Sequence, residues 1–239
     1  MVFCMLFVAS TPVSAMAVTG GVATGGAPAP TVKAPVIKRH TAPVASHSTS
    51  LLYNGPVYEK TTTGQIVPFV SAQASSEQKA VTGGSAAAVP ADSKPELLVP
   101  GHTARVVDSL AAAPMSAPAA VQEIVWAANR IIGLPYVFGG GHASFASPGY
   151  DCSGTVSFAL HGASLLTIPE DSSEFMVWGS HGVGTWVTVF SNPGHAYMTI
   201  AGLRLDTSAA DDPTNQQGPR WRPLRPANSG FTVRHPTSL

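Results

Sequence analysis

Cys152 is the side chain in this sequence best suited to nucleophilic chemistry. It lies in the segment Asp151-Cys152-Ser153-Gly154, directly before a run with helical periodicity. The free N–H groups and the dipole at a helix start favour a thiolate, and the same N–H groups can hold an oxyanion beside the sulfur. Gly154 leaves room for close approach of backbone or substrate. A small buried apolar side chain is the alternative for Cys152 alone.

His195 is the candidate partner for the thiol. It follows the turn at 191–194 and opens an apolar, alternating segment. A strand aims an imidazole rigidly, as a general base requires, and an ordinary edge-strand histidine is the alternative. His161 lies about 13 Å along the helix from Cys152 at 1.5 Å per residue, too far to pair with the sulfur. His142 and His181 lie in loops and stay open as partners for the thiol. The remaining histidines are expected to be solvated: His40, His47, His102 and His235.

The surrounding pattern predicts two helices followed by strands. Apolar residues at helical spacing predict a helix over 118–132, with Pro118 in its first turn. A second helix is expected to begin at Cys152, with Asp151 as its N-cap. Strands are predicted over 185–190, 195–201, 203–208 and 231–234. This order indicates an α+β fold, with N-terminal helices packed on a mainly antiparallel sheet.

The N-terminal half has a different composition. Residues 1–17 hold an apolar run and small residues ending at Ala17, which predicts a signal peptide and export. Residues 18–118 are rich in Ala, Pro, Gly, Ser, Thr and Val, which predicts a long disordered low-complexity spacer, with a lone turn at 51–60. Thirteen aromatic residues lie in 119–239 against three in 18–118, so the folded domain is expected at 119–239.

Charge and cysteine content exclude several classes of protein. The chain has 13 Lys+Arg and 13 Asp+Glu, with no long basic run, which argues against nucleic-acid binding. The sequence has no stretch of about 18 apolar residues, so no membrane-spanning helix is expected. Removal of the leader would remove Cys4 and leave Cys152 without a partner for an internal disulfide.

Three segments together resemble a known family. They are Leu134-Pro135-Tyr136-Val137-Phe138-Gly139-Gly140, then Asp151-Cys152-Ser153-Gly154, then Gly194-His195 entering a strand. Over roughly 120–210 they are similar to the NlpC family of cell-wall cysteine peptidases. The resemblance implies a papain-like fold, bacterial export, and hydrolysis of peptidoglycan stem peptides, usually between D-γ-glutamate and a diamino acid.

The resemblance also implies roles for individual residues. Cys152 matches the nucleophile and His195 the general base. Asp206 falls where relatives carry a polar residue that orients the imidazole, although Asp is not the commonest choice there. Tyr136 matches a tyrosine that lines the site and donates a hydrogen bond near the oxyanion.

Further positions match the family less simply. Asp151 and Ser153 match positions that contact the amino-terminal side of the substrate, and helix capping is compatible with that role. The loop between Gly140 and Asp151 is longer than usual in the family, and His142 is a candidate to line the cleft entry. The strand after His195 has AYMTIAG where relatives more often have VGIYLG.

The expected protein is a secreted or wall-associated monomer that forms a thioester on Cys152 and needs no metal or other cofactor. An amidase or acyl transferase on the same fold stays open. So does an inactive wall-binding module, in which Arg220, Arg222 and Arg225 would grip carboxylates, although a capping strand with solvated arginines is the simpler interpretation. A zinc site from Cys152, His142 and His195 is a remote option, since the spacing fits no closed ligand set.

Overall fold

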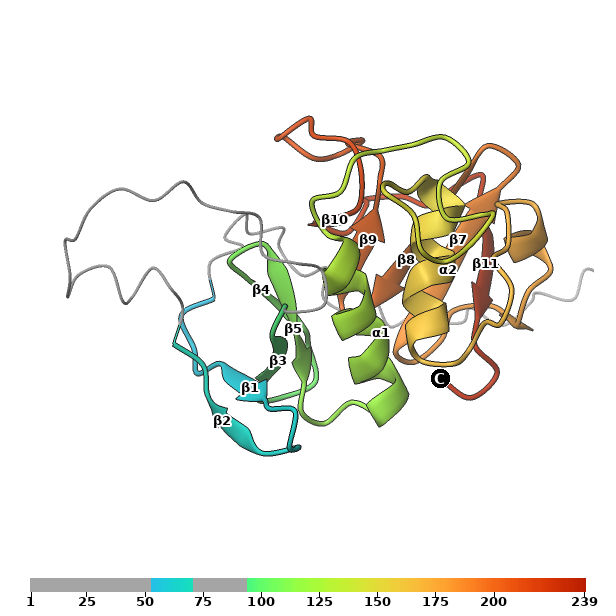
Figure 1. Ribbon diagram of the computed structural model, residues 1–239. Coiled ribbons are helices and arrows are strands. Elements are labelled where there is room, and N and C mark those ends of the chain that lie inside the picture. Colours follow the sequence, from blue (N-terminus) through green and yellow to red (C-terminus); the bar gives the residue numbers. More distant parts are fainter. Residues whose placement is uncertain (1–52, 71–93) are drawn as a thin grey trace, which may run out of the picture. The chain divides into compact units, whose positions relative to one another are not determined.

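The computed structural model describes residues 53–70 and 94–239 (Figure 1). The expected signal peptide at 1–17 and most of the expected spacer therefore lie outside the described residues. The described part contains two α-helices, one short 3-10 helix (η2) and two β-sheets. No helix among the described residues is long and apolar enough to cross a membrane.

The first sheet precedes the expected domain. It has five strands in the order β2-β1-β3-β5-β4, and its neighbours are antiparallel except β3 and β5. A two-residue turn joins β4 to β5, in which Asp108 and Ser109 both have positive φ, as a hairpin of this type requires. The strands are β1 Tyr58–Lys60, β2 Ile66–Pro68, β3 Glu96–Val99, β4 Arg105–Val107 and β5 Leu110–Pro114.

This sheet differs from the spacer and the lone turn expected over 18–118. Composition alone suggested too little apolar surface to fold, yet Ala111, Ala112 and Ala113 are fully buried. Their small side chains let β5 lie close to its neighbours, with Ala112 in a small core of its own beside Leu97 and Val99. Alanine counts as low-complexity in composition, but it packs as a core residue where partners are close.

Long-range hydrogen bonds join this sheet to helix α1 (Ala119–Ile131). The buried Asn129 amide donates to the Ala111 carbonyl and accepts from the Ala111 N–H, both at 2.8 Å. The Trp126 indole donates to the Leu97 carbonyl at 3.0 Å. The Lys94 ammonium donates to the Asn129 and Ile132 carbonyls, each at 2.8 Å, and so satisfies the exposed end of the helix.

The second sheet follows the expected pattern. Its six strands have the order β10-β9-β8-β7-β11-β6, and all paired neighbours are antiparallel. Helix α2 (Cys152–Gly162) begins where predicted, and α1 matches its prediction within one residue at each end. The other elements are η2 Glu174–Met176, β6 Ser180–His181, β7 Val187–Asn192, β8 His195–Ile200, β9 Leu203–Asp206, β10 Arg220–Arg222 and β11 Thr232–His235.

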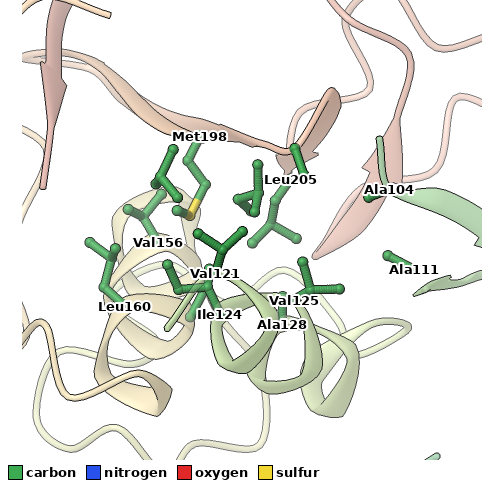
Figure 2. Packing of buried hydrophobic residues seen from close by; sticks show 14 of the residues in the cluster. Ala104, Ala111, Val121, Ile124, Val125, Ala128, Val156, Leu160, Met198 and Leu205 are labelled. Atoms are coloured by element: carbon green, nitrogen blue, oxygen red, sulfur yellow. The ribbon is translucent and has the colours of Figure 1, made fainter. Parts of the chain in front are cut away.

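The main core lies between the helices and one face of the second sheet. Figure 2 shows Met198 of β8 and Leu205 of β9 pointing toward Val121 of α1 and Val156 of α2. All four are fully buried, and each such side chain contributes about 1.5–3 kcal/mol on burial. Because side chains alternate along a strand, the residues between them point to the opposite face of the sheet. That opposite face receives Tyr197 and Asp206.

Candidate active site

Cys152 is the first residue of α2, and Asp151 is its N-cap as predicted. One Asp151 oxygen accepts the Gly154 N–H at 2.8 Å, and the other accepts the Gly139 N–H at 3.0 Å. The extended backbone of Asp151 turns the chain into the helix and leaves Cys152 in the first turn. The thiol is therefore held beside the N–H groups and positive dipole end of α2.

A glycine-rich loop packs tightly against this turn. The Asp151 N–H donates to the Gly140 carbonyl at 3.2 Å. A Cβ on Gly154 would lie 2.0 Å from that carbonyl oxygen, and a Cβ on Gly140 would lie 2.3 Å from the Gly149 oxygen. Gly154 thus permits the close approach of backbone, one of the two uses expected from the sequence.

His195 begins β8 and bonds to Asp206 at the end of β9. Its Nε2 lies 2.9 Å from Asp206 Oδ1, and the Asp206 carboxylate is fully buried. A carboxylate accepts here, so Nε2 carries the proton and Nδ1 is left for the thiol. The Ser208 N–H also donates to Asp206 Oδ1, at 2.9 Å. These contacts fix both the tautomer and the plane of the ring.

The His195 ring and the Cys152 thiol change one another's ionisation. Burial alone would raise the pKa of Cys152, but hydrogen bonds from His195 and the Ala196 N–H, together with the His195 charge, lower it overall. Burial alone would lower the pKa of His195, but bonding to Asp206 and Cys152 and their charges raise it to about 9. Both shifts favour a thiolate–imidazolium pair near neutral pH.

Two buried arginines lie behind Asp206. The sequence analysis did not single out Arg204, and it did not expect Arg222 to be buried here. Arg204 Nη1 is 3.6 Å from Asp206 Oδ2, and both side chains are fully buried. Arg222 Nε donates to the Asp206 backbone carbonyl at 3.0 Å. The strand pattern places both arginines on the sheet face away from the helices, since Arg222 pairs with Arg204 across β10 and β9. Alternation with the core residue Leu205 was the signal available in the sequence.

The expectation of a strand with solvated arginines is wrong for Arg222. The strand exists as β10, but Arg222 is 0% exposed. Its guanidinium forms an ion pair with Asp212 and donates to the Gln216 carbonyl at 2.5 Å. Arg225 lies 5.4 Å from the Tyr197 ring centroid and pairs with Asp211 at 3.3 Å. Arg222 therefore supports the fold of the loop after β9 and is not free to grip a ligand.

Tyr136 lies at the thiol. It is 39% exposed, and burial, followed by the charges of Cys152 and Asp151, raises the pKa of its hydroxyl. The phenol accordingly stays protonated and able to donate where an oxyanion would form. Phe138, two residues further along the same loop, is 91% exposed.

Ser153 and His142 lie behind the helix start. Ser153 is 3% exposed, and its hydroxyl is 3.2 Å from His142 Nε2. His142 Nε2 is in turn 3.0 Å from Asp151 Oδ1. The observed contacts of Asp151, Ser153 and His142 are thus with one another and with backbone. His142 is joined to Asp151, whereas His195 is joined to Asp206.

The remaining histidines have other surroundings. The His161 ring stacks on Phe145 with centroids 3.7 Å apart, and its Nδ1 is 2.9 Å from the Leu166 carbonyl oxygen. His181 pairs with Arg234 between β6 and β11. Within residues 53–70 and 94–239, no group of three or more His, Cys, Asp or Glu side chains is arranged to hold a metal ion.

Comparison with known proteins gives distant structural similarity. No family model and no curated protein matches the chain. A solved structure of an NlpC/P60 family protein from Bacillus cereus ATCC 10987 is 22% identical, covering 49% of this chain and 40% of that one, with a TM-score of 0.38. A similarity of this size says nothing of the site, whose chemistry follows from its own geometry: a Cys-His-Asp arrangement on a mixed α/β protein.

Proposed function

We propose that this protein is a secreted cysteine peptidase of the NlpC family, with a papain-like fold, that hydrolyses peptidoglycan stem peptides. One observation carries the chemistry. His195 is fixed by Asp206 at 2.9 Å and faces a thiol whose pKa it lowers, at the start of a helix. A nucleophile, a base and a group that orients the base form the constellation for acyl transfer through a covalent intermediate.

The reaction follows from these positions. The Cys152 thiolate attacks the amide carbon, a C–S bond forms, and the carbonyl π electrons move onto oxygen. N–H groups at the start of α2 and the Tyr136 hydroxyl stabilise that oxyanion. Protonated His195 gives its Nδ1 proton to the departing nitrogen as the C–N bond breaks, which leaves a thioester. Neutral His195 then takes a proton from water, and the resulting hydroxide attacks the thioester carbon. The C–S bond breaks, which releases the acid and restores the Cys152 thiolate beside protonated His195.

Asp206 keeps the ring in place through both halves of the reaction. Its oxygen accepts from His195 Nε2 in either protonation state of the ring, so the proton exchanged with the thiol and substrate is always the one on Nδ1. The negative charge also stabilises the imidazolium that exists before attack and after water activation. Arg204 supplies the buried countercharge for that carboxylate.

The substrate assignment rests on the residues around the thiol. The segment from Leu134 to Gly140 and the DCSG segment resemble those of NlpC peptidases, which cut between D-γ-glutamate and a diamino acid, and we propose that bond here. The exposed Phe138 and Tyr136 would pack along the stem peptide on either side of that bond.

Mass spectrometry of purified muropeptides tests the proposal. The full chain, its Cys152→Ala variant and a buffer control are incubated with tetrapeptide muropeptides. We expect a new free amine on the diamino acid after incubation with the wild-type chain, and none with Cys152→Ala or with buffer. Exchange of an added amine into the product would instead indicate an acyl transferase. Release of the whole stem peptide would indicate an amidase, and unchanged muropeptides retained by both proteins would indicate a binding module. Each of these three results overturns the proposed peptidase.

A further inference from the structure

The opposite end of β8 from His195 carries a pocket with different chemistry. This pocket, of about 330 Å³, is open to solvent and lies where the residues before β4 meet the β8–β9 turn. From His195 it is six residues along β8, about 20 Å at 3.3 Å per residue. Its lining is His102, Thr103, Thr185, Trp186, Ala201 and Gly202.

Backbone hydrogen bonds hold the floor of the pocket. The Ala104 N–H donates to the Ala201 carbonyl at 2.9 Å, and the Ala201 N–H donates to the Trp186 carbonyl at 2.8 Å. Ala201 and Gly202 form a two-residue turn with φ of 47° and 91°. A two-residue hairpin turn of this type requires positive φ at both positions, as at Asp108 and Ser109. The turn presents a methyl group and a bare backbone to the pocket.

His102 is oriented by the protein and offers a free acceptor. The Ser116 hydroxyl lies 2.7 Å from the Gly101 carbonyl oxygen and 2.8 Å from His102 Nδ1. The hydroxyl has a single proton, which it gives to the carbonyl, so it accepts the proton of Nδ1. The neutral ring therefore leaves Nε2 as a hydrogen-bond acceptor at the pocket.

Trp186 supplies the apolar wall. It is half-buried, packs on the main core, and its ring centroid is 6.2 Å from that of His102, with the planes 31° apart. Thr103 and Thr185 also line the pocket, and among the residues that the structure describes no Asp, Glu, Lys or Arg lines it. A pocket lined by an indole, an imidazole and two threonines suits an uncharged ring with C–H groups on its faces and hydroxyls at its rim. Sugars have this chemistry, whereas the charged ends of a peptide do not.

We propose that this pocket binds one uncharged sugar ring of a peptidoglycan glycan strand. The proposal rests on the proposed function for the choice of glycan. The two stem residues before the proposed scissile bond span about 7 Å when extended. The pocket lies about 20 Å from His195 by the strand rise. It would therefore bind a sugar ring that is distant from the peptide being cut. It would hold the enzyme on the wall without contributing to the chemistry at Cys152.

Binding is tested on the full chain carrying Cys152→Ser, so that ligand is not consumed. The probes are a tetramer of N-acetylglucosamine and glycan strands freed of stem peptides, titrated by calorimetry and by saturation-transfer NMR. We expect saturable binding with a Kd on the order of 1 mM for the tetramer. Trp186→Ala and His102→Ala should each weaken it about tenfold or more, and Trp178→Phe, a tryptophan outside the pocket, should not.

A second measurement separates this proposal from the first. The Trp186→Ala variant that keeps Cys152 should digest intact sacculi about tenfold more slowly than the wild-type chain does. It should cleave soluble muropeptides at the wild-type rate. His102 is exposed, so His102→Ala covers the case in which Trp186→Ala fails to fold. Glycan binding without any Cys152-dependent hydrolysis would contradict the proposed peptidase activity and support the proposed sugar site. Absence of saturable binding, or binding unchanged in both pocket variants, would overturn the sugar site.

Discussion

Arg204 forms an ion pair with one oxygen of a buried carboxylate, and His195 forms a hydrogen bond with the other. Asp206 Oδ2 lies 3.6 Å from Arg204, and Oδ1 lies 2.9 Å from His195. Continued through the thiol, the charges alternate from guanidinium to carboxylate, imidazolium and thiolate. Each charge thus has an opposite neighbour, and three of the four belong to the β8–β9 hairpin.

Asp206→Asn should lower kcat for muropeptide cleavage by about 10²–10⁴-fold with a small change in KM. The amide can donate to Nε2 and so favours the wrong tautomer, with the proton on Nδ1 in the neutral ring. Steady-state kinetics on a defined stem peptide measure the change. Asp211→Asn is the matched control, because that carboxylate pairs with Arg225 and makes no contact with His195. Equal rates for Asp206→Asn and wild type would remove Asp206 from the site.

The rate of Cys152 alkylation should rise with pH and then level off, because it needs only the thiolate. The value of kcat/KM should instead follow a bell-shaped curve in pH. The thiolate forms above the lowered pKa of Cys152, and His195 stays protonated until its pKa of about 9, so kcat/KM should fall above pH 9. In Asp206→Asn the ring loses its charged partner, the pKa of His195 falls, and the alkaline limb moves to lower pH. Iodoacetamide labelling and kcat/KM profiles measure the two limbs. An alkaline limb that stays in place in the variant would contradict the assignment.

Arg204→Met should destabilise the fold by about 3–5 kcal/mol, because it leaves the Asp206 carboxylate buried without its countercharge. Chemical denaturation measures the loss. The double variant Arg204→Met with Asp206→Asn should recover part of it, since no buried charge then lacks a partner. If the double variant loses the sum of the two single losses, the two side chains are not coupled.

Asn129→Ala should cost about 2–4 kcal/mol of stability and loosen β5 from α1. The substitution leaves the Ala111 N–H and carbonyl unpaired, together with the Trp221 indole N–H that Asn129 also accepts at 2.8 Å. Limited proteolysis within 94–118 and thermal unfolding measure the effect. Gln122→Ala on the same helix is the control, because its amide makes only longer contacts to carbonyls. Comparable protease resistance in the two variants would argue against this anchor.

Gly154→Ala should destabilise the protein even though alanine normally stabilises a helix. The new Cβ would lie 2.0 Å from the Gly140 carbonyl oxygen, a backbone atom that cannot move without shifting the loop. Because that loop also carries Tyr136 and Phe138, kcat/KM should fall with stability. A melting temperature above that of wild type would show that the loop gives way at little cost.

Local patterns predicted the elements that position the thiol. Helical spacing located α1 and α2, the turn before His195 located β8, and the polar cap at Asp151 located the start of the second helix. Composition failed for β5, since the burial of its alanines depends on Asn129 and other partners distant in the sequence. The burial of Arg222 was not foreseen for the same reason: only the pairing of β10 with β9 places Arg222 beside Asp206.

The Lys94 side chain joins the segment before β3 to the end of helix α1. Its ammonium binds carbonyls at the end of α1, so the residues just after it belong to the same cooperative unit as the helix. A cut between Lys94 and α1 would therefore divide that unit. It would separate β3, β4 and β5 from α1 and expose Trp126 and Asn129, whose hydrogen-bond partners Leu97 and Ala111 lie in those strands, and the product would be prone to self-association.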